Sequence, residues 1–223
     1  AGTVLKNELT GETVYTPPQD KDTILELMSN LEEYMNVSNN LDPLIKMGAI
    51  HYQFESIHPF YDGNGRTGRI LNVLFLVLKG LLDIPILYLS KYIIRNKAEY
   101  YRLIQHVHVN QEWEEWILFI LEAIEKTSLD TIVLIKEISR IMDETKSLMK
   151  SQLPKIYSKE LLESLFMHPY TKTEYIIERL NVHRDTASTY LKKLTNLDIL
   201  ECTKLGRQNY YINKKLYKLL AGQ

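Results

Sequence analysis

The stretch at residues 58–69 reads HPFYDGNGRTGR and comes directly before an apolar segment at residues 70–78. It packs three of the nine glycines of the chain into six consecutive residues. The apolar segment predicts a helix, so the glycine-rich turn opens that helix. A helix N-terminus offers main-chain N–H groups without partners and the positive end of the helix dipole, and glycine lets an anion approach closely. The stretch therefore predicts a phosphate-binding site.

The charged side chains of this stretch suit the same kind of ligand. Arg66 and Arg69 are three residues apart, so they project from one helix face and can hold a polyphosphate with two guanidinium groups. Asp62 adds one hard carboxylate, which suits Mg²⁺, and the imidazole of His58 can accept a proton from an attacking hydroxyl. Each residue alone is common in loops or on surfaces, whereas the four together at this spacing favour a functional site.

The composition describes a folded protein rather than a basic or an acidic disordered chain. The 223 residues include 27 Lys and Arg against 28 Asp and Glu. From Ser158 onward there are 11 basic and 7 acidic residues, against 16 and 21 before it, so the net charge of the last part is positive and that of the preceding part is negative.

Cys202 is the only cysteine, which excludes a disulfide within the chain and favours a reducing, cytoplasmic location. The longest apolar stretch, 70–89, contains several polar residues, so no membrane association is expected.

The pattern of apolar residues predicts a mainly α protein. Glycine and proline are missing between Ile86 and Leu153, which favours helices there, and helices are also expected at 22–36 and 43–56. Only the start reads as strand: a hairpin at about 3–16 ends before two prolines. These elements together predict a helical domain over residues 1–155.

The last part of the chain has the pattern of a winged helix-turn-helix domain, at residues 156–223. A helix is expected at 159–167, then two short helices at 173–180 and 184–196 with a three-residue turn between them. Two strands are expected at 199–203 and 209–212.

The stretch at 58–69 resembles the twelve-residue motif of the Fic family, His-Pro-Phe-x-Asp-Gly-Asn-Gly-Arg-x-x-Arg, at every defined position. The likeness extends to the hairpin and to residues 51–55, 85–90, 99–101 and 113–116, which together span about two thirds of the chain. The resemblance implies a Fic-type helical bundle with a hairpin flap. Fic proteins with a C-terminal winged helix form a familiar subgroup, which the tail of this chain resembles.

The resemblance also implies an activity: Mg²⁺-dependent transfer of AMP from ATP to a Tyr, Thr or Ser hydroxyl of target proteins and of the enzyme itself, with release of pyrophosphate. His58 would be the base, Asp62 would hold Mg²⁺, and the flap would dock the target by strand addition. Phe60 would belong to the core. The implied ATP-binding residues are Gly63, Asn64, Gly65, Arg66, Thr67, Gly68, Arg69, Tyr100 and Tyr101. His108 stands where some relatives have asparagine.

Many Fic enzymes are inhibited by a helix whose glutamate, followed by Gly or Asn, pairs with the second arginine of the motif, here Arg69. No glutamate of this chain is followed by either residue. Because the chain starts with Ala1 in the flap itself, we expect an upstream segment to carry that helix, and a chain starting at Ala1 to modify itself faster than a longer form.

Other readings of the sequence remain open. The same Fic site could remove AMP or transfer another phosphate-containing group, or it could sense a nucleotide for a DNA-binding regulator. The DNA-binding candidates are Arg184, Thr186, Ser188, Lys192 and Arg207. The winged helix could equally serve in dimerisation or docking, and a homodimer stays possible in this reading. His51 and Glu55 have a spacing that suits zinc, but the better role of His58 argues against it.

Overall fold

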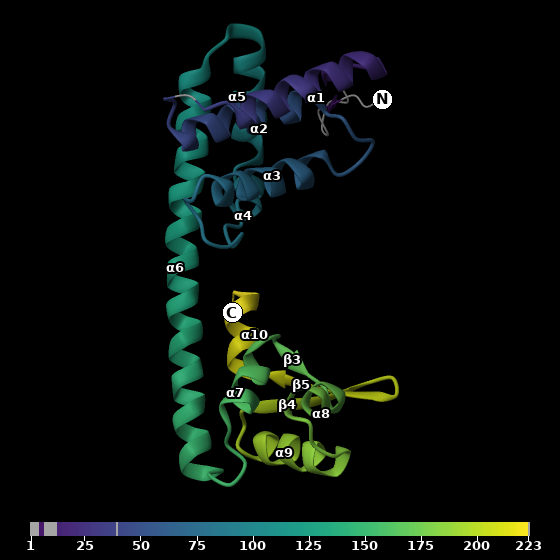
Figure 1. The fold of residues 1–223 in the computed structure, drawn as a ribbon, viewed down its shortest axis with the longest axis vertical. Helices are drawn as coiled ribbons and strands as arrows, with labels where there is room; N and C mark the ends of the chain where they lie inside the picture. The colour runs from purple at the N-terminus through teal and green to yellow at the C-terminus, as the bar shows by residue number, and fades with distance from the viewer. Residues whose placement is uncertain (1–4, 7–12, 39, 223) are drawn as a thin grey trace. The chain divides into compact units, whose positions relative to one another are not determined.

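The computed structural model describes residues 5–6, 13–38 and 40–222. The chain divides into two compact units, Ala1–Thr131 and Ile132–Gln223 (Figure 1). The predicted mainly α fold is confirmed. The division falls inside a long helix, so the boundary near residue 155 stays a prediction about domain limits.

The first unit contains a short hairpin and most of the helices. Strands β1 (Leu5–Lys6) and β2 (Thr13–Tyr15) pair antiparallel, with Leu5 opposite Tyr15. The turn of the predicted flap, at 7–12, lies outside the described residues. The helices are α1 (Lys21–Asn36), α2 (Pro43–Ile57), α3 (Asn64–Leu78), α4 (Ser90–Arg95), α5 (Lys97–Asn110) and the first half of α6 (Trp113–Gln152).

Local signals explain where the first helices begin. The carboxylate of Asp20 accepts a hydrogen bond from the Thr23 amide and caps α1. Asp42 does the same for the Leu44 amide at the start of α2, where proline occupies the first position and loses no hydrogen bond. These two caps place α1 and α2 within two residues of the predicted starts.

Helix α2 is the centre of the first core. Its residues Met47, Ile50, Phe54 and Ile57 are almost fully buried, and Figure 1 shows α2 between α1 and α3. The indole Nε1 of the buried Trp116, in α6, donates a hydrogen bond of 2.9 Å to the carbonyl of Gly48. A side chain on Gly48 would meet Ile117 at 2.7 Å, so glycine allows α2 and α6 to approach closely.

Helix α6 joins the two apolar patterns that the sequence shows around residues 113–124 and 134–142 into one helix. It contributes Trp116 and Phe119 to the first core and Met149 to the second. Among residues 5–6, 13–38 and 40–222, no helix has both the length and the apolar character needed to cross a bilayer.

The second unit has the order of elements expected for a winged helix. It contains α7 (Lys159–Phe166), β3 (Tyr170–Thr171), α8 (Thr173–Leu180), α9 (Arg184–Asn196), β4 (Leu200–Leu205), β5 (Gln208–Asn213) and α10 (Lys214–Ala221). The antiparallel sheet has the order β3-β5-β4, and Gly206, with φ +62°, turns β4 into β5. Sequence reasoning missed β3 and α10. Helix α10 carries an Asn213 cap and an apolar stripe that could have revealed it.

Candidate active site

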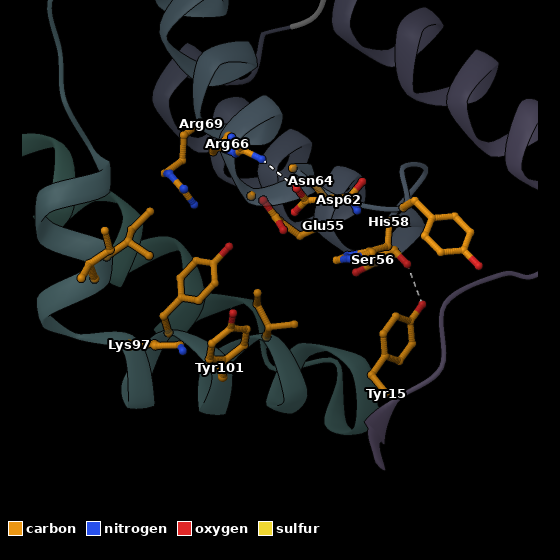
Figure 2. A pocket seen from close by; sticks show the side chains of 17 residues that line it. Tyr15, Glu55, Ser56, His58, Asp62, Asn64, Arg66, Arg69, Lys97 and Tyr101 are labelled. Atoms are coloured by element: carbon orange, nitrogen blue, oxygen red, sulfur yellow. Dashed lines mark hydrogen bonds and ion pairs between the residues drawn. The ribbon is translucent and has the colours of Figure 1, made fainter. Parts of the chain in front are cut away.

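A cavity of about 370 Å³ lies where the end of α2, the start of α3 and the helices α4 and α5 meet (Figure 2). It brings together most of the residues that the motif predicts, and adds several that it does not. Its lining consists of Tyr15, Glu55, Ser56, His58, Tyr61, Asp62, Gly63, Asn64, Gly65, Arg66, Arg69, Ile93, Ile94, Lys97, Tyr100, Tyr101 and Ile104. The candidate base, the two arginines and the tyrosine pair therefore share one cavity.

His58 ends α2 and begins the motif loop. Its backbone is left-handed (φ 51°, ψ 54°), and its amide donates to the Phe54 carbonyl at 3.0 Å. Burial lowers the pKa of the imidazole, and the main-chain carbonyl of Glu55 only partly opposes this change. Because the pKa lies below its ordinary value of 6.5, His58 is neutral near pH 7 and can accept a proton.

The motif loop is closed by a single buried side chain. Asn64 accepts a hydrogen bond from the Phe60 amide at 2.8 Å and donates one to the Phe60 carbonyl at 2.6 Å. Sequence reasoning placed Asn64 among the ATP-binding residues, but the structure commits its side chain to the loop. Phe60 itself is 47% exposed, so the expectation that it lies in the core is wrong. Its ring lies 6.3 Å from that of Phe54.

The start of α3 keeps the properties of an anion site. The helix begins at Asn64 rather than after the motif, so both arginines lie in its first two turns. Gly63, with φ +88°, precedes it, and among the described residues no side chain caps the first N–H groups. These main-chain donors and the helix dipole favour a negatively charged ligand at this end of α3.

The two arginines have different partners. Arg66 forms an exposed ion pair with Asp62 at 3.0 Å (Figure 2), whereas Arg69 Nε donates a hydrogen bond of 2.7 Å to Ser90 Oγ. Exposed ion pairs contribute about 0 to 1 kcal/mol to stability, so Asp62 can exchange Arg66 for another partner at little cost.

Three polar residues that are wholly or partly buried are affected by the charge of Arg69. His51 Nε2 and the Tyr100 hydroxyl are 3.0 Å apart, and burial, aided by the charge of Arg69, lowers the pKa of His51 to about 3. Burial also raises the pKa of Tyr100. The pKa of Glu55 rises to about 7 because burial outweighs the opposing charge of Arg69. The sequence shows the spacing of His51 and Glu55 but gives no sign of these shifts.

Glu55 also explains a glycine of the motif. A side chain on Gly68 would lie 2.6 Å from Glu55 Oε1 and 3.0 Å from the Phe54 ring. Gly68 therefore serves the close packing of α3 on α2. Neither Gly68 nor Thr67 lines the cavity, so the structure does not place these two predicted ATP-binding residues at the site.

The side of the cavity formed by α5 is aromatic. Tyr100 is buried, whereas Tyr101 is 42% exposed, and the two rings meet edge to face with centroids 5.3 Å apart. Lys97 Nζ lies 5.9 Å from the centroid of the Tyr101 ring. An exposed aromatic face beside a cation suits a nucleobase or ribose next to phosphates. Sequence reasoning missed Lys97, although its position one helix turn before Tyr101 could have indicated it.

Tyr15, the last residue of β2, joins the hairpin to the site. Its hydroxyl donates a hydrogen bond of 2.9 Å to the carbonyl of Ser56, two residues before His58 (Figure 2). Its ring meets that of His108 edge to face, with centroids 4.7 Å apart. His108 thus contacts the hairpin and does not line the cavity.

A Mg²⁺ ion fits the donors present at the cavity. Within the described part of the chain, no three His, Cys, Asp or Glu side chains cluster as a metal cage would require. Asp62 offers one hard, 91% exposed carboxylate beside the anion site. Magnesium is usually held by one or two carboxylates together with water and substrate phosphates, so Asp62 alone is a suitable protein ligand.

The predicted DNA-binding residues all lie in the second unit. Arg184 and Lys192 are exposed on α9, and Arg207 is exposed at the β4–β5 turn. Thr186 and Ser188 are partly buried on the same helix.

Comparison with known proteins gives matches for both parts of the chain. Residues 3–76 match the Fic/DOC family, and residues 141–216 match the family described as the C-terminal domain of SoFic-like protein adenylyltransferases. The protein adenylyltransferase Fic of Drosophila grimshawi is 32% identical over 115 residues, which are 51% of this chain and 22% of that protein. The probable protein adenylyltransferase aq_aa38 of Aquifex aeolicus is 37% identical over 79 residues, 35% of this chain and 24% of that protein.

The chain thus spans about a fifth to a quarter of the length of these curated relatives. The crystal structure of a Fic family protein from Desulfovibrio desulfuricans G20 has a TM-score of 0.50 and 22% identity, and the match covers 94% of this chain and 59% of that one. At this identity the likeness concerns the fold.

Proposed function

This chain carries a Fic domain followed by a SoFic-like C-terminal domain, and from this premise we propose that it is a protein adenylyltransferase. It would transfer AMP from ATP to a hydroxyl side chain of target proteins and of itself. The observation that carries the proposal is the neutral, half-buried His58 in the same cavity as Arg66, Arg69 and the uncapped start of α3. A proton acceptor beside a polyphosphate site is what hydroxyl attack on a nucleotide requires.

In the proposed reaction, His58 accepts the proton of the target hydroxyl as its oxygen attacks the α-phosphorus of ATP. A new bond forms between that oxygen and phosphorus, and the bond from phosphorus to the bridging oxygen breaks. Pyrophosphate then leaves. Arg66, Arg69 and the first N–H groups of α3 hold the phosphates and stabilise the charge that develops on them.

Asp62 would hold Mg²⁺, which, when bound, neutralises phosphate charge. To bind the ion, the Asp62 carboxylate must release Arg66. Their ion pair is exposed and therefore weak, which supports an exchange of Arg66 for Mg²⁺. The released Arg66 is then available to the phosphates.

The nucleoside would lie against α5, where Tyr101 is exposed and Lys97 lies near its ring. The target segment would extend the β1–β2 hairpin, where main-chain hydrogen bonds align an acceptor with little demand on sequence. The bond from Tyr15 to Ser56 supports this placement, because it ties the hairpin to the turn that carries His58.

The test is incubation of the chain with Mg²⁺ and ATP labelled at the α-phosphate, followed by intact mass measurement. We expect a mass gain of one AMP that is lost in His58→Ala. His183→Ala is a matched control, because this exposed histidine lies in the second unit, and its variant should label like the wild type. If ATP binds but neither the chain nor proteins of a cell lysate become labelled, the site instead removes AMP, transfers another group or senses nucleotide.

A role of the C-terminal unit in binding duplex DNA is a second proposal, supported by the exposure of Arg184 and Lys192 on α9. We expect binding to weaken steeply with salt and to weaken further in Arg184→Ala and Lys192→Ala. Binding that is insensitive to salt and to both substitutions would contradict this role. Cytoplasmic location and a homodimer stay predictions from the sequence.

A further inference from the structure

Ser90, the first residue of α4, holds one of the two arginines of the motif. Arg69 Nε donates to Ser90 Oγ at 2.7 Å, across 21 residues of sequence. Among the described residues, the terminal nitrogens Nη1 and Nη2 of Arg69 take part in no hydrogen bond. The contact therefore fixes the guanidinium by its inner nitrogen and leaves the two outer nitrogens for a ligand.

The guanidinium is held over the start of α3. A side chain on Gly65 would lie 2.9 Å from Arg69 Nη1 and 3.7 Å from Nη2. Gly65 thus leaves the space that the guanidinium fills. The outer nitrogens consequently lie beside the first turn of α3, whose N–H groups have no side-chain cap within the part of the chain that the structure describes.

Ser90 stands on a firmly anchored backbone. Leu89 and Ile93, on either side of it, are 2% and 4% exposed, and the Ile93 amide donates to the Leu89 carbonyl at 3.1 Å. Lys91 also pairs with Asp130 of α6 at 3.1 Å. The hydroxyl is therefore presented at a fixed place, although α4 has only six residues.

Glu55 is a competing partner for the same guanidinium. Its Oε1 is buried without a hydrogen bond in the described part of the chain, and the charge of Arg69 acts on its pKa. An arginine released from Ser90 would gain by turning toward this carboxylate. In the structure Arg69 is instead hydrogen-bonded to Ser90.

We propose that Ser90 is a positioning residue, which holds Arg69 ready for the terminal phosphates of the nucleotide. The inference rests on the proposed use of ATP. It predicts that Ser90 contributes to the binding of nucleotides with β- and γ-phosphates and contributes little to the binding of AMP, because AMP does not reach Arg69.

The experiment is calorimetric titration of the whole chain with AMP and with α,β-methylene ATP, which cannot release pyrophosphate. Ser90→Ala should weaken binding of the triphosphate about tenfold, as expected for a lost hydrogen bond to a charged group, and leave AMP binding within about twofold. Ser90→Thr keeps the hydroxyl and should restore affinity. Ser90→Cys has a side chain of similar size whose sulfur is a weak hydrogen-bond acceptor, so it should show the same selective loss of triphosphate affinity. Ser29→Ala, at an exposed position of α1, should show no loss.

A double-mutant cycle separates positioning from a general effect on α4. In an Arg69→Ala background, Ser90→Ala should cause no further loss of triphosphate affinity. The inference would be overturned if Ser90→Ala weakened triphosphate binding as much in the Arg69→Ala background as in the wild type. It would also be overturned if Ser90→Ala weakened the binding of AMP and of the triphosphate equally. Either result would leave the use of ATP intact. Failure of the wild type to bind the triphosphate at all would overturn the proposed use of ATP, and the inference with it.

Discussion

Glu55 and His51 make opposite contributions to the pH dependence of stability, and Glu55→Gln should expose the contribution of His51. The pKa of Glu55 rises on folding from 4.5 to about 7, so its stabilising contribution is complete below 4.5 and lost as the pH rises through 7. The pKa of His51 falls from 6.5 to about 3, so its contribution is complete above 6.5 and lost as the pH falls toward 3.

The two effects have similar size. Between pH 7.5 and pH 5, linkage gives a gain of about 2 kcal/mol from Glu55 and a loss of about 2 kcal/mol from His51. In the wild type they nearly cancel. In Glu55→Gln the side chain no longer titrates, so acidification over this range should destabilise the variant by about 2 kcal/mol more than the wild type.

Urea unfolding followed by tryptophan fluorescence measures this difference. Trp113 and Trp116, the two tryptophans of the chain, both lie in the first unit, and Trp116 is fully buried, so the signal reports the unit that contains Glu55. Glu26→Gln, on an exposed position of α1, is the matched control and should follow the wild type at both pH values. Parallel pH profiles for Glu55→Gln and the wild type would refute the burial argument.

Four further outcomes are expected, one for the rate and three for stability. The transfer rate should fall on acidification only below pH 6.5, because burial lowers the pKa of His58, and a pH–rate profile with its acidic limb above 6.5 would contradict this. Gly63→Ala should lower the free energy of unfolding by about 1 to 2 kcal/mol, since φ is +88° there, and Gly68→Ala by about 1 to 3 kcal/mol through overlap with Glu55. Trp116→Phe should lower it by about 1 to 3 kcal/mol by leaving the Gly48 carbonyl unpaired; unchanged urea midpoints would refute these three estimates.

The residues of the motif could be assigned from the sequence because they are neighbours along the chain. A turn that opens a helix is a local feature, and it places His58, Asp62 and the two arginines in the lining of one cavity. The short helices α8 and α9 were likewise predicted with their observed bounds, since apolar spacing and tight turns are local signals.

The remaining features depend on packing between distant segments. Ser90 meets Arg69 across 21 residues, and Tyr15 meets Ser56 across 41, so neither contact has a signature in the sequence. The role of Asn64 depends on which way its side chain turns, and the pKa of Glu55 depends on what covers it. The sequence predicted helices between residues 86 and 153, but it did not show that a single helix, α6, runs from Trp113 to Gln152.

The bond between Tyr15 and Ser56 joins a side chain to a main-chain carbonyl, and this has a consequence for tolerance to mutation. Any residue at position 56 supplies the same carbonyl, whereas position 15 must supply a hydroxyl at the end of an aromatic ring. Substitutions at 56 should therefore keep this bond and be accepted more widely than those at 15 in a saturation screen for activity, although Ser56 also lines the cavity. Position 15 should accept almost none, phenylalanine included, although the two residues share one hydrogen bond.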